Sequence, residues 1–588
     1  MENVQDKPKS NEFKPKTTEE LRKAVNLCYE NWDIASEKKK IINIYGEIST
    51  WNTSLITDMS ELFVDKKYFN ANINAWDVSN VTNMEGMFYN ATFFNQPLDS
   101  WDVSNVTNMK YMFYNTLFNQ PLDSWDVSNV TNMKGMFYKA SRFNQPLNDW
   151  DVSNVTDMGS MFLEASRFNQ PLNDWDVSNV TNMDAMFRGA EIFVKPLNSW
   201  DVSNVTNMES MFYEALYFDE PLNEWVVSKV TNMKGMFYGA LHFNKSLNSW
   251  DVSNVINMEG MFMKARDFNQ PLNEWDVSNV TDMRGMFEKA PSFNQSLNEW
   301  NVSKVINMWG MFNDASIFNQ PLNEWNVSNV TDMGTMFSGT SWFNQPLNKW
   351  NVSNVTSMDF MFCGAERFNQ PLNEWNVSKV TNMDSMFNCA HSFNQPLNEW
   401  DVSNVTNMFA MFINSKYWWN SKFDQPLNEW NVSKVTDMRY MFSGASSFNQ
   451  PLNKWNVSNV TNMKNMFSFA RNFNQPLDSW DVSNVTNMEK MFYCARDFNQ
   501  PLNEWNVSNV TNMKGMFSYC INFDQPLNKW NVSSLTKVDF IFDNTGVDFI
   551  FDNIGKTYKI RQHVESWEIP ETTDSRYMFT KKVRSTSF

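Results

Sequence analysis

The chain has few of the residues from which catalytic and metal sites are built. Only 3 His and 5 Cys occur among its 588 residues, and His242, His391 and His563 lie far apart in the sequence. No Ser-His-Asp set, H-E-x-x-H motif or glycine-rich phosphate loop occurs. Because a convergent set of dissimilar reactive groups is missing, there is no candidate active site. We therefore expect a protein that is not an enzyme and has no catalytic residue, metal site or cofactor.

Cysteines and long apolar runs are too scarce for a disulfide framework or a membrane span. Cys363 and Cys389 occupy similar places in adjacent repeats, as do Cys494 and Cys520, and we expect buried thiols. No apolar run approaches the ~20 residues of a spanning helix. The first residues, MENVQDKPKSNEFKPK, contain no apolar segment of a signal peptide, and no lipidation motif occurs. We expect an intracellular, cytoplasmic protein, with the cell surface by an unconventional route as the alternative.

The charge balance limits the partners. The formal net charge is −18, from 48 basic and 66 acidic residues, which repels polyanions. We expect a protein partner, no nucleic acid, no membrane insertion, and a monomer or weak self-association.

The abundant residues belong to one repeated sequence motif. The chain has 40 Met, 49 Phe and 26 Trp, and a tryptophan returns about every twenty-five residues from Trp51 to Trp530. Around it the sequence reads W-[DN]-V-S-N-V-T-N-M-x-x-M-F-x-x-A-x-x-F-N-Q-P-L-N-x, about twenty times. Self-similarity at a fixed period of this length is typical of a solenoid. Positions in the repeat are numbered from the tryptophan as position 1.

Each repeat predicts a strand, a short helix and a turn. Alternating apolar residues in L-N-x-W-[DN]-V-S favour a strand with one buried face. Met, Met, Phe and Ala at i, i+3, i+4 and i+7 form one apolar helix stripe. F-N-Q-P-L then turns the chain. Such units must stack to bury their apolar faces, so we expect an α/β repeat solenoid of about twenty units with one parallel sheet and ladders of identical side chains.

The L-x-x-W-x-V-S-x-V-T-x-M-x-x-M-F-x-x-A-x-x-F string resembles the BspA-type leucine-rich repeat. The F-N-Q-P-L and W-D-V-S-N-V-T-N-M phrases are most similar to its mycoplasma-lipoprotein-type subgroup with 25-residue repeats. The resemblance runs from about Tyr45 to Asn544. It implies a right-handed leucine-rich-repeat-like solenoid used for protein contact, adhesion or host interaction.

The ends of the chain depart from the repeat. A capping box from Thr17 to Glu20 opens a predicted helix whose Leu21, Ala24, Val25 and Cys28 share one face. A helix there would cover the open end of the sheet. The expected organisation is a disordered N-terminus (1–16), an N-terminal helical cap (17–45), the repeat solenoid (46–533) and a degenerate C-terminal cap and tail (534–588).

One repeat carries a loop insertion near residues 414–422, which contains Trp418 and Trp419 side by side. Insertions in repeats fall in surface loops, and exposed tryptophans there would anchor a partner. The alternative is that the loop folds over its own solenoid and buries them.

Acidic residues flank the tryptophan on the face opposite the core. Asp is common at position 2 before about residue 280, and Asn afterwards. The candidate partner-binding carboxylates are Asp126, Asp149, Asp151, Asp174, Asp176 and Asp201. On adjacent strands about 5 Å apart, each like-charge pair repels by roughly 1 kcal/mol in water. Solvent with hydrogen bonds from Asn and Ser, a docked basic protein patch, or a bridging divalent cation would each relieve this repulsion.

We therefore expect a non-enzymatic protein-binding scaffold that uses an acidic concave sheet for host or partner interaction. The most variable positions, 10, 11, 14, 15, 17 and 18, are expected on a solvated convex back. Two alternatives stay open: a structural or adhesive, self-associating solenoid, and a divalent-cation-binding repeat array.

Overall fold

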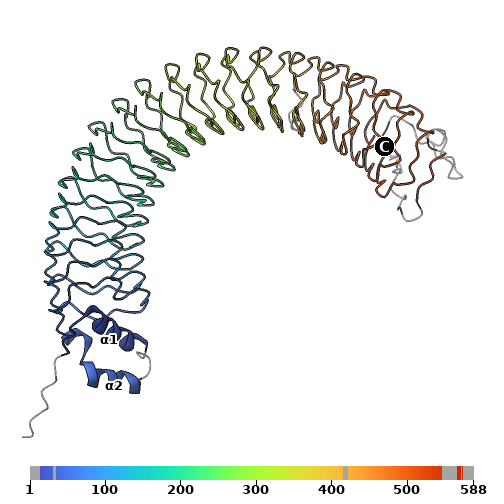
Figure 1. The fold of residues 1–588 in the computed structure, drawn as a ribbon. Helices are drawn as coiled ribbons and strands as arrows, with labels where there is room; N and C mark the ends of the chain where they lie inside the picture. The colour runs from blue at the N-terminus through green and yellow to red at the C-terminus, as the bar shows by residue number, and fades with distance from the viewer. Residues whose placement is uncertain are drawn as a thin grey trace, which may run out of the picture. The chain divides into compact units, whose positions relative to one another are not determined.

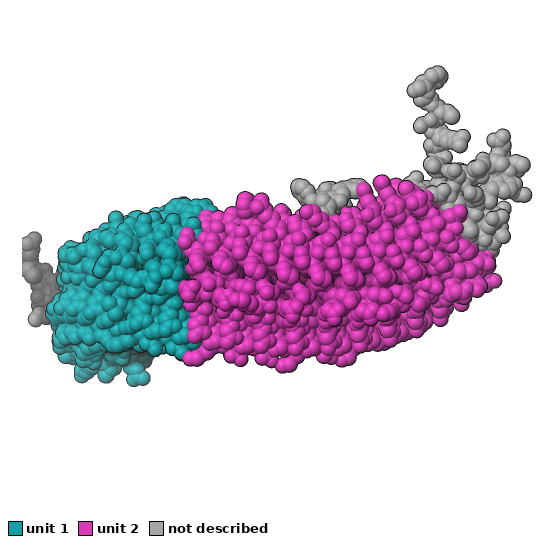
Figure 2. Space-filling model, turned by 90° about the horizontal axis from the view of Figure 1, so that it is seen from above, with its two compact units in different colours: residues 1–280 teal, residues 281–588 magenta. Residues whose placement is uncertain are grey.

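The computed structural model of the chain describes residues 13–30, 35–414, 421–543, 545, 564, 566–570 and 573. The chain divides into two compact units, Met1–Val280 (unit 1) and Thr281–Phe588 (unit 2) (Figure 2). Each unit is a stack of coils with one coil per repeat (Figure 1).

Helices occur only before the first coils within the described part of the chain. They are α1 (Thr18–Glu30), α2 (Ala35–Tyr45) and the single 3-10 turn η1 (Ile48–Thr50). None of the described helices is long and apolar enough to cross a membrane.

Neighbouring coils pair at position 8, not along the predicted strand at the tryptophan. Isolated parallel bridges join Asn83 to Asn108 in unit 1 and Asn462 to Asn487 in unit 2. The tryptophan segment is a turn instead, in which the Trp101 amide donates to the Leu98 carbonyl three residues earlier, at 3.1 Å. The predicted strand is therefore wrong, and a column of single bridges takes the place of the expected sheet in the described residues.

The predicted helix of each repeat is also wrong, because positions 9 to 16 form consecutive β-turns. The Met87 amide donates to the Met84 carbonyl (3.2 Å), and Gly86 between them has φ +57°. Alternate amides are then free to bond to the next coil, as Phe88 N does to Met112 O at 2.9 Å. A helix is about 10–12 Å wide and would hold coils apart, whereas bridged strands lie about 4.8 Å apart. Turns allow the coils to stay in contact along their whole circumference.

The burial predicted from the same residues is correct. Met84, Met87, Phe88 and Ala91 are completely buried, because successive turns also bring i, i+3, i+4 and i+7 to one side. Phe88 stacks on Phe113 of the next coil with ring centres 5.5 Å apart and planes within 3°. Identical side chains therefore form the expected ladders in the core.

The tryptophans form the ladder that fixes the register of the coils. Trp125 and Trp150 in unit 1 have ring centres 6.5 Å apart with planes within 3°. Beyond the first coil, indole N–H groups also donate to a backbone carbonyl of the preceding coil, as Trp150 Nε1 does to Leu122 O at 3.0 Å, whereas Trp51 Nε1 has no partner among the described residues. The stack and the hydrogen bond require the same register.

At the start of unit 1, α1 lies over the first coil (Figure 1). Thr17 Oγ1 caps it by accepting a hydrogen bond from the Glu20 amide at 3.2 Å. Thr18 Oγ1 donates to the Asp58 carbonyl and Arg22 Nη2 to the Ser60 carbonyl, both at 2.7 Å. These donors take the place of the coil that is missing at this end. Four residues were expected on one face of the helix. Cys28 is half-buried, and the other three are buried: Leu21, Ala24 and Val25.

The tryptophan ladder of unit 2 extends one step beyond the recognised repeats. Trp567 stacks on Trp530 with ring centres 5.8 Å apart, and its Nε1 donates to Leu527 O at 3.0 Å. It comes 37 residues after Trp530 instead of 25. Because of this longer spacing, the repeat pattern did not identify it as a ladder residue. The phrase V-E-S-W in place of L-N-K-W is the signal that could have identified it.

Two further expectations have different outcomes. Residues 415–420, with Trp418 and Trp419, lie outside the described residues. Cys520 is buried as expected, but Cys363, Cys389 and Cys494 are only half-buried, so the prediction of buried thiols is wrong for these three. Their positions fall in the turn segment and not on the core stripe.

Replacing Trp150 with Phe should lower the free energy of unfolding by about 1–3 kcal/mol, because the buried Leu122 carbonyl loses its donor. Urea denaturation followed by circular dichroism measures the effect. The neighbouring exposed change Asp151→Asn should stay within about 0.5 kcal/mol of the unaltered chain. An unaltered stability of W150F would contradict a role for the indole N–H.

Replacing Thr335 with Gly should raise the free energy of unfolding by up to about 1 kcal/mol. Thr335 occupies position 11 with φ +54°, which costs an L-residue roughly 1–2 kcal/mol. In a helix, the same change would destabilise by a few tenths of a kcal/mol, because glycine is a poorer helix former than threonine, so the sign separates turn from helix. Thr335 Oγ1 is also buried without a hydrogen-bond partner among the described residues. Thr335→Val removes that hydroxyl but keeps the strained backbone, and its stability isolates the backbone contribution.

Candidate functional site

The six candidate aspartates lie on one exposed face of unit 1, which we call the acidic face. The buried tryptophan of each coil turns inward, and the residues on either side of it, at positions 25 and 2, turn outward. Asp126, Asp149, Asp151, Asp174, Asp176 and Asp201 are all exposed. They come from four consecutive coils, so the ladder that aligns the tryptophans also aligns the carboxylates.

Local donors hold these carboxylates in place. At position 2, Oδ1 of the aspartate accepts the amide of the serine two residues later, as Asp126 does from Ser128 at 3.0 Å. The same bond of 3.0 Å recurs from Ser203 to Asp201. Hydrogen bonds from the hydroxyl and amide of Ser128 and Ser203 lower the pKa of Asp126 and Asp201 below the ordinary value. These two aspartates therefore stay charged well into mild acid.

At the densest part of the acidic face, asparagines at position 24 hold the position-25 carboxylate. Asn173 Nδ2 donates to Asp174 at 2.7 Å, and Asn148 Nδ2 donates to its second oxygen. Asp151 and Asp176 accept the amides of their serines, each at 3.0 Å. Amide groups of Asn and Ser thus hold three of the four carboxylates in this part of the face by hydrogen bonds: Asp151, Asp174 and Asp176.

The structure adds a hollow to the acidic face that the sequence did not reveal. An open depression of about 500 Å³ lies between the coils of Trp200 and Trp225. Its lining includes the carboxyl residues Asp201 and Glu224 and the side chain of Val226, which is 54% exposed. Val226 occupies position 2, where other coils place Asp or Asn. The hollow therefore combines negative charge with an apolar patch.

The corresponding columns of unit 2 carry less negative charge. Position 2 there is mostly Asn, as at Asn301 and Asn326. Position 25 includes lysines that pair with the glutamate of the preceding coil, with Lys349 Nζ 2.5 Å from Glu324 Oε1. The acidic face is therefore a property of unit 1.

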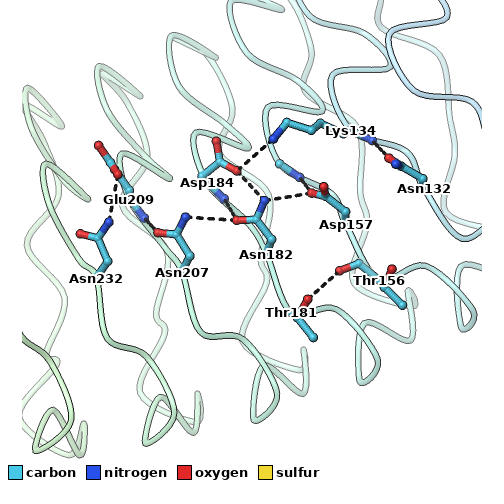
Figure 3. Close-up of polar contacts among 11 residues, drawn as sticks. Asn132, Lys134, Thr156, Asp157, Thr181, Asn182, Asp184, Asn207, Glu209 and Asn232 are labelled. Carbon is cyan, nitrogen blue, oxygen red and sulfur yellow. Dashed lines mark hydrogen bonds and ion pairs between the residues drawn. The ribbon is translucent and has the colours of Figure 1, made fainter. Parts of the chain in front are cut away.

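On a second polar face, formed by positions 8 and 10, asparagine amides and lysines bond to the acidic side chains (Figure 3). Asn182 Nδ2 donates to Asp157 at 3.0 Å and to Asp184 at 2.6 Å. Lys134 lies 3.9 Å from Asp184 two coils away, across Gly159, which has no side chain to intervene. Position 10 was expected on a solvated back, but it borders the bridge column and links coils. The charged side chains at this position bond to other side chains of the same molecule, as Lys134 and Asp184 do.

The arrangement of His, Cys, Asp and Glu side chains in the described residues does not favour a metal ion. Across residues 13–30, 35–414 and 421–543 and the few described residues beyond them, no group of three or more His, Cys, Asp or Glu side chains is placed to hold an ion. The cation-bridging interpretation of the acidic face therefore has no supporting geometry.

Comparison with known proteins gives a family. The sequence family described as "Mycoplasma protein of unknown function, DUF285" matches residues 33–147, 115–225, 139–247, 214–325, 315–422, 413–493 and 473–587. The mycoplasma-type resemblance is thus confirmed at the level of a family. No curated protein matches the chain.

Two similar solved structures have low sequence identity to this chain. The crystal structure of a TLR13–ssRNA13 complex shares 9% identity over 88% of this chain and 94% of that chain, with a TM-score of 0.15. The functional domain of InlJ from Listeria monocytogenes shares 12% identity over 72% of this chain and 71% of that one, also with a TM-score of 0.15. At these scores neither likeness carries a structural or functional argument.

Replacing Ser203 with Ala should raise the pKa of Asp201 toward its ordinary value, because the serine hydroxyl is the first cause of its lowering. A carboxyl pKa that is lowered by folding adds stability above the unfolded pKa, and this stability is lost as the pH falls through the folded pKa. The S203A chain should therefore lose that contribution at a higher pH. Carbon-detected NMR titration measures the Asp201 pKa. Ser228→Ala, at the same position beside Val226, is the control and should leave it unchanged.

Proposed function

Since the chain belongs to the DUF285 family, whose description names no reaction, we propose that it is a non-enzymatic scaffold that binds a partner protein through the acidic face of unit 1. The partner contributes an extended, basic segment. Surface carboxylates recur with every coil, so a chain that runs along the stack meets one acidic group after another.

The contrast between the two polar faces carries this proposal. On the face of positions 8 and 10, several acidic residues have a lysine partner, such as Glu85 with Lys110 at 2.9 Å, while others such as Glu209 are held by an asparagine amide. On the acidic face, Asp151, Asp174 and Asp176 are held by amide donors, which leave their net charge in place. Uncompensated charge of one sign attracts and orients a partner of the opposite sign.

The hollow beside Val226 indicates which side chain of the partner is preferred. A lysine or arginine has an aliphatic stem and a cationic head. The stem fits against the exposed Val226, and the head lies within reach of Asp201 and Glu224, which line the same depression. A guanidinium would gain most there, because it forms charge-assisted hydrogen bonds to two carboxylates.

Two structural parts of the chain fit a scaffold of this kind. We propose that residues 17–45, with α1 and α2, form a cap on the open end of the first coil, because their donors satisfy its carbonyls. The loop with Trp418 and Trp419 stays a predicted second anchor for a partner.

Changing Asp149, Asp151, Asp174 and Asp176 together to Asn should abolish capture of the partner. Affinity capture from the native host with quantitative mass spectrometry compares this variant with the unaltered chain. The lost partner should be basic in sequence, and its capture by the unaltered chain should weaken as salt is raised, since exposed charges are screened over about 10 Å at 0.1 M.

The matched control is a second chain with the same change of charge away from the acidic face: Glu19→Gln, Glu164→Gln, Glu191→Gln and Glu214→Gln. This chain should keep the partner. Equal recovery of every partner by both variants would show that the acidic face does not bind. Equal loss of the partner from both variants would show that capture depends only on the total charge of the chain.

A further inference from the structure

A cavity lies where α1 covers the first coil of unit 1. Its volume is about 630 Å³, which is within the range of roughly 300–1,000 Å³ typical of small-ligand sites. Three elements form its wall: α1 contributes Val25 and Tyr29, η1 contributes Ile48, and the end of the first coil contributes Tyr68 and Phe69. The cavity is independent of the acidic face.

The wall is mostly apolar. Val25, Ile48 and Phe69 are buried side chains, and Ala71 adds a small residue at the edge. Cys28 and Asn70 supply the polar atoms. Such a surface favours a ligand with a hydrocarbon body and few polar groups.

Two ammonium groups lie beside the cavity on the rings of its tyrosines. Lys66 Nζ is 5.3 Å from the centre of the Tyr29 ring, and Lys67 Nζ is 5.4 Å from the centre of the Tyr68 ring. Both cations lie on rings that line the cavity, in a chain with net charge −18. They complement an anionic head group.

The Cys28 end of the cavity has the opposite preference. Burial, and to a smaller extent the Glu47 carboxylate, raises the pKa of the Cys28 thiol to about 11. The thiol therefore stays neutral at physiological pH and behaves as an apolar wall group. Glu47 disfavours an anion near Cys28, which leaves that end for the hydrocarbon.

We propose that this cavity binds a fatty acid, with the hydrocarbon chain against Val25, Ile48 and Phe69 and the carboxylate beside Lys66 and Lys67. Burial of the methylenes favours binding, and the cations favour a charged head over a neutral one. A neutral alcohol of equal length keeps the contribution of the buried methylenes and loses the attraction to the two cations.

Cys28 provides a local measure of binding. Dodecanoate, added below its micellar concentration to the full chain, should slow alkylation of Cys28 by iodoacetamide at least fivefold. Cys363, Cys389 and Cys494 should react at unaltered rates, and peptide mass spectrometry follows all four thiols in one sample. Unprotected Cys28 at saturating dodecanoate would overturn the proposal.

Calorimetric titration tests the head group. Dodecanoate should bind at least tenfold more tightly than dodecanol, and dodecyltrimethylammonium should bind more weakly than either. Lys66→Met with Lys67→Met should abolish the preference for dodecanoate over dodecanol. If the three ligands bind equally, or if the double variant keeps the preference, the assignment of the carboxylate to these lysines is wrong.

Ala71→Phe should block all three ligands by filling the edge of the cavity. Thermal unfolding shows whether this variant folds. If it does not, the lysine variant, which changes one half-buried and one exposed side chain, tests the proposal instead. Binding of dodecanoate that Ala71→Phe leaves unchanged, in a folded chain, would place the ligand elsewhere and overturn the proposal.

Discussion

Every feature of this molecule depends on the register between one coil and the next. The indoles of the ladder stack along the coils and donate to carbonyls of the preceding coil, as Trp325 Nε1 does to Leu297 O at 2.9 Å in unit 2, whereas Trp51 Nε1 has no partner among the described residues. A shift by one residue would break the stack and leave a buried donor and a buried acceptor unpaired, which costs about 1–3 kcal/mol for each group. The same register aligns the phenylalanine ladders inside and the carboxylates outside. The acidic face is therefore a consequence of how the core packs.

The sequence predicted burial well and backbone conformation poorly, for one physical reason. Side chains at i, i+3, i+4 and i+7 point inward from a helix and also from successive β-turns, so Met84, Met87 and Phe88 are buried in either case. The turns need positive φ at positions 11 and 15. Glycine marks some of these sites, such as Gly86, but Lys139 and Ser210 adopt the same conformation and give no signal.

The candidate site was predictable in its members and not in its surroundings. Because the Trp column is buried, its exposed neighbours follow from the repeat alone, and all six aspartates are exposed as their spacing required. The hollow at Val226 depends on how two coils meet, and the cavity beneath α1 depends on contacts between residues some forty positions apart, such as Thr18 with Asp58. Long-range packing of this kind leaves no periodic trace. Trp567 was missed for a related reason, since a long insertion separates it from the ladder it joins.

Exchange of the indole Nε1 protons tests the coil register most directly. In a chain labelled with nitrogen-15 at tryptophan, the buried and hydrogen-bonded indole protons of the ladder should exchange with deuterium only when neighbouring coils open, as for Trp455 Nε1, which donates to Leu427 O at 2.8 Å. We predict that these signals persist long after those of a free indole have vanished. Exchange at the rate of free tryptophan in the folded chain would contradict the account, because the coils would then be held by something other than the tryptophan ladder.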